Sequence, residues 1–328
     1  MSAKRGRDGT PLPSVGERSE AAGEPGRDAS TARVAALAPD GSESRPYLAA
    51  VAAKDFDLES TLGCGQVFHW VREGAGWLGA VGDAALYVEQ GGGRVFVSPG
   101  AEKMAARYLA LDHPLAEICA TFPGDPAMAE AARFCRGMRI VRQPAWECVA
   151  TFITSSMKQV AHIAQISHTL RRRFGARLEW NGRELFAYPT PEALGRLNEA
   201  DLRACALGFR AKNLLGAARM IAEGAVDLAK VAQMDDAAAR AELCRLPGVG
   251  EKVANCALLF GFERVRAFPI DVWIERVLRE LYFKRKRKVT TQRLRDFSTE
   301  YFGPYGGYAQ QYLFHHARKT WPRGRGKG

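Results

Sequence analysis

The sequence Leu246-Pro247-Gly248-Val249-Gly250-Glu251-Lys252 decides the fold of this chain. It separates two helical patterns, an alanine-rich one over 235–245 and an apolar one over 252–260. Pro247 ends the first helix, and Gly248 and Gly250 are expected to take positive φ angles in a tight reversal. Bare N–H groups at the start of a helix can hold a phosphate without reading bases. The stretch therefore predicts a helix-hairpin-helix whose Gly248, Val249 and Gly250 bind DNA.

Lys252 and Asp271 are the candidate catalytic residues. Lys252 lies in the first turn of the second helix, where the helix dipole and desolvation would favour a neutral, nucleophilic amine. Asp271 precedes an apolar helical run and is expected at its N-cap. The helix carries the chain away by roughly 15 Å, and the loop 261–270 can span up to about 30 Å, so Asp271 can return to Lys252. Alone, Lys252 would be a phosphate contact and Asp271 a cap; their order and spacing favour catalysis.

Basic charge gathers at the carboxy-terminal end. The 328 residues carry a net charge of +11. Residues 284–328 hold twelve Lys/Arg against two Asp/Glu, whereas residues 1–46 hold seven of each. A basic region of this kind indicates a polyanionic partner, and the hairpin motif favours DNA.

Cysteine and histidine usage predicts neither a metal nor a cofactor. The seven cysteines form no CxxC pair, which indicates reduced thiols inside a cell. No cysteine follows Cys256, which excludes a cysteine-ligated iron–sulfur cluster near the carboxy terminus. We interpret His315 and His316 as surface or DNA-facing residues, since neighbours on a helix cannot point the same way.

The chain is not expected to enter a membrane. No apolar run approaches the roughly 18 residues of a transmembrane helix, and the amino terminus lacks the apolar core of a secretory signal. We expect a monomer in a bacterial cytoplasm, or in the nucleus if the source is eukaryotic.

The pattern along the chain predicts an α+β fold. Residues 1–46 are rich in Gly, Pro, Ser and mixed charges, so we expect a disordered tail. Over 47–133, alternating segments and glycine clusters indicate an antiparallel sheet domain. A helical domain over 134–322 and a basic tail over 323–328 follow. The alternation falls at 56–58, 66–70, 76–81, 85–88 and 94–97.

Almost everything after residue 127 is expected to be helical. The predicted helices are 101–109, 113–120, 127–135, 145–158, 160–174, 190–196, 199–207, 212–223, 228–234, 235–245, 252–260, 271–282, 291–301 and 308–321.

Five motifs between residues 47 and 321 resemble, in order, those of the 8-oxoguanine DNA glycosylase family of the helix-hairpin-helix superfamily. The resemblance implies a small, TBP-like antiparallel sheet domain followed by a two-lobed helical domain. The motifs are Leu62-Gly63-Cys64-Gly65-Gln66-Val67-Phe68-His69-Trp70, Tyr108-Leu109-Ala110-Leu111-Asp112, Gln143 with Trp146-Glu147-Cys148, Phe152-Ile153-Thr154-Ser155-Ser156, and Leu246–Lys252 with Asp271.

The resemblance implies a bifunctional repair enzyme acting on double-stranded DNA that contains an oxidised purine. Lys252 would attack the sugar C1′, expel 8-oxoguanine or a ring-opened purine, and form a Schiff base. β-Elimination would then break the strand on the 3′ side. Asp271 would orient the attack and stabilise positive charge on the sugar.

The resemblance also implies a pocket for the flipped base. Gly65 would offer its carbonyl to the N7–H of 8-oxoguanine, which guanine lacks. Cys256 and Phe314 would sandwich the base, and Gln310 would contact its Watson–Crick edge. Taken alone, Gly65 would be a turn glycine, Cys256 a core thiol and Phe314 core packing.

The contacts to the opposite strand depart from the family pattern. Met157, followed by Lys158 and Gln159, stands where the family has an asparagine that fills the gap left by the base. His162 stands where the family has one of two arginines that read the opposite cytosine.

Arg210 matches the second arginine, and Phe209 matches an aromatic wedge that kinks the duplex. Trp273 replaces a histidine that contacts phosphate. We hypothesise looser discrimination of the base opposite the lesion.

Three alternatives stay open at this stage. A monofunctional glycosylase for alkylated purines would use Asp271 and water, with Lys252 incidental. A noncatalytic protein would use the hairpin for phosphates alone. A structural helical protein would bind RNA through its basic tail.

Overall fold

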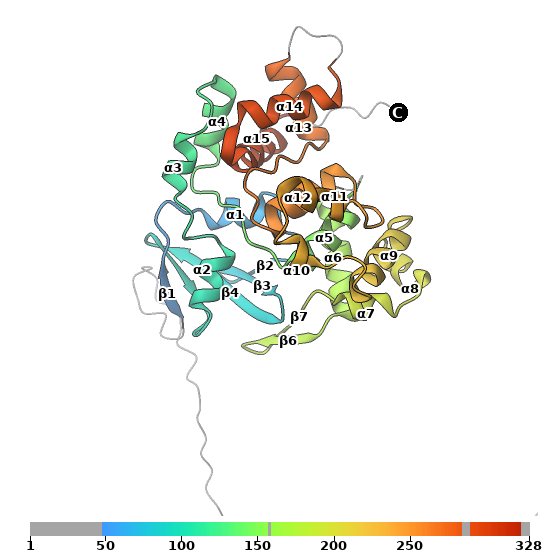
Figure 1. Cartoon of the computed structure of the whole chain (residues 1–328). Helices are drawn as coiled ribbons and strands as arrows, with labels where there is room; N and C mark the ends of the chain where they lie inside the picture. Colours follow the sequence, from blue (N-terminus) through green and yellow to red (C-terminus); the bar gives the residue numbers. More distant parts are fainter. Residues whose placement is uncertain (1–47, 157–158, 284–288, 323–328) are drawn as a thin grey trace, which may run out of the picture. The chain divides into compact units, whose positions relative to one another are not determined.

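The computed structural model describes residues 48–156, 159–283 and 289–322 (Figure 1). The predicted tails, 1–46 and 323–328, lie outside the described residues, as do Met157 and Lys158. Within the described ranges, no helix is long and apolar enough to cross a membrane. The seven cysteines are free thiols.

A five-stranded antiparallel sheet opens the described chain, in the order β1-β5-β4-β3-β2. The meander predicted over 76–97 is confirmed, with Leu78 opposite Tyr87 and Val88 opposite Val97. Alternate residues point to one face, where they pack with α2 (Glu102–Tyr108) in a core of their own. The strands are β1 (Ala49–Ala52), β2 (Val71–Glu73), β3 (Gly76–Val81), β4 (Ala84–Gly91) and β5 (Arg94–Val97).

Two segments predicted as strands are not strands. Asp57 accepts the Ser60 N–H at 2.5 Å and so begins a helix, α1 (Leu58–Gly63). Residues 66–70 are buried without a strand partner. The Gln66 amide donates to the Thr61 and Arg139 carbonyls instead, at 2.7 and 2.8 Å. The alternation there reflects burial between the sheet and the helices rather than pairing.

Helices fill most of the remaining described chain, as predicted. Those predicted at 160–174 and 291–301 begin and end where expected, and others differ by a few residues at their ends. They are α3 (Leu115–Ala120), α4 (Pro126–Phe134), α5 (Ala145–Ser155), α6 (Val160–Phe174), α7 (Pro191–Gly195), α8 (Glu199–Arg203), α9 (Arg210–Ala222), α10 (Leu228–Val231), α11 (Asp236–Leu243), α12 (Glu251–Gly261), α13 (Val272–Val277), the π-helical turn η1 (Leu278–Tyr282), α14 (Thr291–Tyr301), the 3₁₀ turn η2 (Gly303–Tyr305) and α15 (Gly306–Thr320).

A hairpin within the helical part was not predicted. It consists of β6 (Arg177–Trp180) and β7 (Arg183–Phe186). Asn181 and Gly182 form its turn with φ angles of 45° and 74°, and Asn-Gly is the pair that such two-residue turns favour. Trp180 stacks on Tyr87 at 4.6 Å and donates to the Ser98 hydroxyl at 2.9 Å. The hairpin therefore packs against β4 of the first sheet.

The last helix, α15, packs against α4 and α13 (Figure 1). The Tyr312 hydroxyl donates to the Met138 carbonyl at 2.8 Å, and His113 hydrogen-bonds the Tyr308 hydroxyl at 2.7 Å. His315 and His316 are buried, so the prediction of surface residues was wrong. Burial lowers the pKa of His315 to about 4, which keeps the ring neutral in this core.

A buried ionic cluster joins the first sheet to the helices. Arg171 on α6 donates to the Glu147 carboxylate on α5 and to the Phe186 carbonyl at 3.1 Å. His69 lies 3.3 Å from the same carboxylate and hydrogen-bonds the Ala80 carbonyl at 2.8 Å. Burial and the Arg171 charge hold the pKa of His69 well below its usual range.

Removing one partner of this cluster should destabilise the fold strongly. Arg171→Met leaves the Glu147 carboxylate buried without its guanidinium partner, which costs about 3–5 kcal/mol. Adding Glu147→Gln removes the charge and should restore part of the loss. Urea unfolding measures both. The control is Arg203→Met, which breaks the exposed Arg203–Glu199 pair and should lower the free energy of unfolding by less than about 1 kcal/mol. Equal losses of stability for the two arginine substitutions would contradict the expectation.

Candidate active site

The helix-hairpin-helix lies where it was predicted, between α11 and α12. Gly248 has a φ of +82°, and a Cβ built on it would lie 2.8 Å from the Asn213 Cβ. Val249 is buried and anchors the turn. Gly250 has a φ of −100° and caps α12, so the predicted positive φ is right for Gly248 and wrong for Gly250. A Cβ built on Gly250 would meet nothing within 4 Å, and the residue is exposed, so its backbone is accessible.

Lys252 lies in the first turn of α12, with its side chain directed toward α5. The ammonium group donates to the Ser155 hydroxyl at 3.4 Å and lies 5.2 Å from the centre of the Phe152 ring. Ser155 is held in turn by its bond to the Phe152 carbonyl at 2.8 Å. Ser155 and Phe152 thus hold the candidate nucleophile, a role that their sequence motif did not predict.

Cys256 lies one turn beyond Lys252 on α12 and is buried. Burial raises the pKa of the Cys256 thiol to about 11, and the hydrogen bond and charge of Lys252 oppose that shift only in part. The thiol is therefore protonated at neutral pH, and it presents a neutral, polarisable surface beside the amine.

Asp271 caps α13, as predicted, and accepts the Ile274 N–H at 2.8 Å. Burial raises the pKa of the Asp271 carboxyl, whereas the Ile274 hydrogen bond and the Lys252 charge lower it. The Lys252 charge acts on both the Asp271 carboxyl and the Cys256 thiol. The three groups, which come from both sides of the loop 261–270, therefore lie within electrostatic range of one another.

Gly65 and two residues of α15 form a second group. Gly65 has a φ of +91°, and a Cβ built on it would lie 3.5 Å from the Phe314 ring. Gln310, one turn before Phe314, is buried, and its Oε1 has no hydrogen-bond partner among the described residues. A buried amide oxygen without a partner is costly, and a polar ligand would satisfy it.

The carbonyls around Gly65 differ in their partners. Arg318 donates to the Gly63 carbonyl at 2.7 Å and Gln311 to the Cys64 carbonyl at 3.4 Å. Gln143 donates to the Gln66 carbonyl at 2.8 Å. Within the described chain, the Gly65 carbonyl accepts no hydrogen bond.

The residues predicted to contact the opposite strand have different exposures. Gln159, at the start of α6, and His162 in its first turn are exposed. Phe209 is 58% exposed, with the guanidinium of Arg210 4.2 Å from its ring centre. Arg210 itself is buried, and it donates to the Ser156 carbonyl at 2.7 Å and the Leu207 carbonyl at 3.3 Å.

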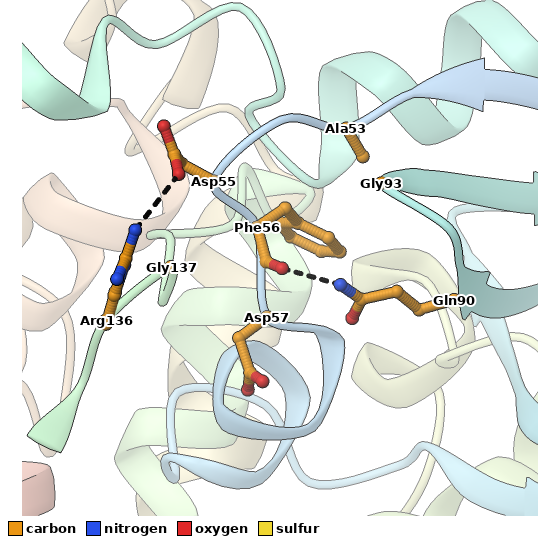
Figure 2. A pocket seen from close by; sticks show the side chains of 8 residues that line it. All are labelled: Ala53, Asp55, Phe56, Asp57, Gln90, Gly93, Arg136 and Gly137. Atoms are coloured by element: carbon orange, nitrogen blue, oxygen red, sulfur yellow. Dashed lines mark hydrogen bonds and ion pairs between the residues drawn. The ribbon is translucent and has the colours of Figure 1, made fainter.

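A cavity of about 280 Å³ lies elsewhere, between the strands and the turn after α4 (Figure 2). Gln90 donates across it to the Phe56 carbonyl at 2.6 Å, and Asp55 pairs with Arg136 at 3.8 Å. None of the predicted site residues lines it. Its lining residues are Ala53, Asp55, Phe56, Asp57, Gln90, Gly93, Arg136 and Gly137.

The two hairpin glycines should respond differently to alanine. Gly248→Ala places a Cβ against Asn213 at a positive φ and should cost about 1–2 kcal/mol of stability. Gly250→Ala should leave stability within about 0.5 kcal/mol and weaken duplex binding about tenfold, since it crowds a backbone donor to phosphate. Urea unfolding and fluorescence anisotropy separate the effects. Unchanged DNA affinity in Gly250→Ala would show that no phosphate approaches there.

Comparison with known proteins agrees with this organisation. Residues 49–149 match the 8-oxoguanine DNA glycosylase N-terminal domain, and residues 150–300 match the HhH-GPD superfamily of base excision DNA repair proteins. A probable N-glycosylase/DNA lyase of Methanothermobacter thermautotrophicus is 31% identical over 61% of this chain and 70% of its own. The N-glycosylase/DNA lyase of Arabidopsis thaliana is 30% identical over 79% and 77%.

A solved structure is similarly close. The 8-oxoguanine glycosylase/lyase of Clostridium acetobutylicum, in complex with duplex DNA containing cytosine opposite 8-oxoguanine, superposes with a TM-score of 0.79 at 30% identity. It covers 84% of this chain and 97% of its own. The five-stranded sheet of the described chain lies within the first matched region, and the helix-hairpin-helix lies within the second. This chain therefore belongs to the N-glycosylase/DNA lyase family that carries the 8-oxoguanine DNA glycosylase N-terminal domain.

Proposed function

We propose that this chain excises 8-oxoguanine from duplex DNA and then cleaves the strand at the abasic site by β-elimination. The observation that carries the proposal is the Lys252 amine at the start of α12, which donates to the Ser155 hydroxyl and lies within electrostatic range of Cys256 and Asp271. The Methanothermobacter and Arabidopsis relatives are named N-glycosylase/DNA lyases, and the Clostridium protein is an 8-oxoguanine glycosylase/lyase.

Lys252 supplies the nucleophile. Its unprotonated amine attacks C1′ of the sugar, the C1′–N9 bond breaks, and the base leaves with the bonding electrons and takes a proton. Ring opening of the sugar gives an imine between Lys252 and C1′. Loss of a C2′ proton then expels the 3′ phosphate. The imine requires a primary amine, so arginine cannot replace lysine.

Asp271 stabilises the positive charge that develops on the sugar. Its carboxylate is fixed by the Ile274 N–H before substrate arrives, so little reorganisation is needed during the reaction. Burial strengthens its field at the reacting carbon. Capping therefore serves the chemistry as well as the helix.

The damaged base would be held between the two residue groups after it flips out of the duplex. The Gly65 carbonyl, which no described side chain caps, would accept the N7–H of 8-oxoguanine and repel the N7 lone pair of guanine. The unpaired Gln310 oxygen would accept from the N–H groups of the Watson–Crick edge. The Cys256 thiol and the Phe314 ring would enclose the base from its two faces.

Borohydride should trap a covalent adduct between the wild-type chain and an 8-oxoguanine duplex, because reduction fixes the imine. Lys252→Gln and Lys252→Arg should give no adduct, and Lys230→Gln on the exposed face of α10 should trap normally. Asp271→Asn, which preserves an N-cap, should slow base release about 10²-fold. Denaturing electrophoresis measures the adduct and the released base is quantified separately.

The remaining outcomes separate the alternatives. Base release without an adduct would indicate a monofunctional glycosylase that uses Asp271 and water. Duplex binding without base release would indicate a noncatalytic DNA-binding protein. Binding to RNA in preference to DNA would indicate a structural helical protein that binds RNA through its basic tail.

We also propose that the enzyme discriminates weakly among bases opposite the lesion. His162 lacks the planar, two-pronged donor set of arginine. The Arg210 guanidinium donates to the Ser156 and Leu207 carbonyls. Fewer of its N–H groups therefore remain to contact a cytosine. The substitution at position 162 and the internal bonds of Arg210 both reduce the number of donors aimed at one base.

Excision rates opposite C, A, G and T should therefore lie within about tenfold of one another. His162→Arg should raise the preference for C by at least about fivefold, because one specific base contact contributes about 1–3 kcal/mol. Gln165→Arg adds the same charge one turn further along α6 and should not change the preference. A strict preference for C in the wild type would contradict the proposal.

The proposed partner is double-stranded DNA that contains an oxidised purine, bound by a monomer. A substrate of this kind places the enzyme in the compartment that holds the DNA, the cytoplasm of a bacterium or a eukaryotic nucleus.

A further inference from the structure

Arg318 lies at the junction of three parts of the proposed base pocket. It follows Phe314 by one helical turn, so both side chains leave the same face of α15. Its guanidinium carbon is 5.5 Å from the centre of the Phe314 ring. Its Nη1 would lie 3.0 Å from a Cβ built on Gly65, so the guanidinium lies beside the space where a side chain at position 65 would begin.

The hydrogen bond from Arg318 reaches the Gly63 carbonyl at 2.7 Å. Gln311, two turns earlier on the same face, holds the Cys64 carbonyl, and Gln143 holds the Gln66 carbonyl from another element. Three carbonyls around Gly65 are thus fixed by side chains. The Gly65 carbonyl has no such partner among the described residues.

Glycine at position 65 cannot set its own carbonyl direction by side-chain packing. The direction depends on the backbone around it: Gln311 and Gln143 hold the two adjacent carbonyls, and Arg318 holds the next one back, that of Gly63. The Arg318 bond is charge-assisted, which is the stronger kind. The same guanidinium packs on the Phe314 ring, where a cation attracts the aromatic face. One side chain therefore orients both the proposed acceptor and the proposed stacking surface.

We propose that Arg318 is a positioning residue for lesion recognition, which directs the Gly65 carbonyl and holds Phe314 without taking part in the chemistry at C1′. The inference rests on the proposed excision of 8-oxoguanine. It implies that base excision and strand cleavage depend on Arg318 unequally, because cleavage of a preformed abasic site involves no base in the pocket.

The test compares Arg318→Met, which keeps the aliphatic stem, with Arg318→Lys, which keeps the charge and one donor. Single-turnover excision of 8-oxoguanine should fall about tenfold or more in Arg318→Met, the effect of losing one charge-assisted hydrogen bond. Arg318→Lys should recover part of this loss. The tenfold loss in excision corresponds to about 1.4 kcal/mol. The rate of cleavage of a preformed abasic duplex should stay within about twofold of the wild-type rate in both variants.

Arg276→Met is the matched control. Arg276 also donates to a backbone carbonyl, that of Pro322 at 2.9 Å, and lies 5.0 Å from an aromatic ring, that of Trp321. It contacts neither Gly65 nor Phe314 within the described chain, so both activities should be unchanged. Thermal unfolding of each variant shows that the fold is retained.

Two results would overturn the inference and differ from failure of the proposed function. Normal 8-oxoguanine excision by Arg318→Met, or an equal loss of excision and abasic cleavage, would remove the positioning role. If the wild type cleaves abasic DNA but excises no 8-oxoguanine, the proposed function fails, and the inference fails with it.

Discussion

The contact between α15 and the loop at residues 63–66 is the constraint on which the site depends. These segments are separated by most of the described chain, yet Arg318 and Gln311 hold them together through the Gly63 and Cys64 carbonyls. These two bonds place Gly65 beside the face of α15 that carries Phe314. Lys252 is held by other contacts, those to Ser155 and Phe152 on α5, so the proposed base-recognition residues and the proposed nucleophile are positioned separately.

The hairpin and its flanking helices could be predicted because their causes are local. Pro247 excludes a continuous helix, Gly248 takes the positive φ that a reversal needs, and Asp271 accepts an N–H at a helix start. Gly250 was wrongly given a positive φ, because two glycines in one turn look alike in sequence. What separates them is Asn213 beside the first and open space beside the second.

Several of the failures came from contacts distant in sequence. Residues 66–70 alternate like a strand but are buried between two layers, and His315 and His316 look polar but face the core. The β6–β7 hairpin was predictable from Asn181-Gly182 and was overlooked beside strong helical patterns. The partners of Lys252 and the capped carbonyls around Gly65 depend on tertiary packing, which no local pattern encodes. The catalytic and pocket roles remain predictions that the proposed variants test.

The cluster of His69, Glu147 and Arg171 has a consequence for how this fold can change over evolutionary time. His69 comes from the segment before β2, and Glu147 and Arg171 come from two helices. The charge that is tolerated at each of the three positions therefore depends on the residues at the other two. If the sheet domain were exchanged with that of a relative, the new residue at position 69 would have evolved next to different helices. Recombination at this junction is therefore constrained by electrostatic compatibility as well as by shape, and substitutions at the three positions should be inherited together.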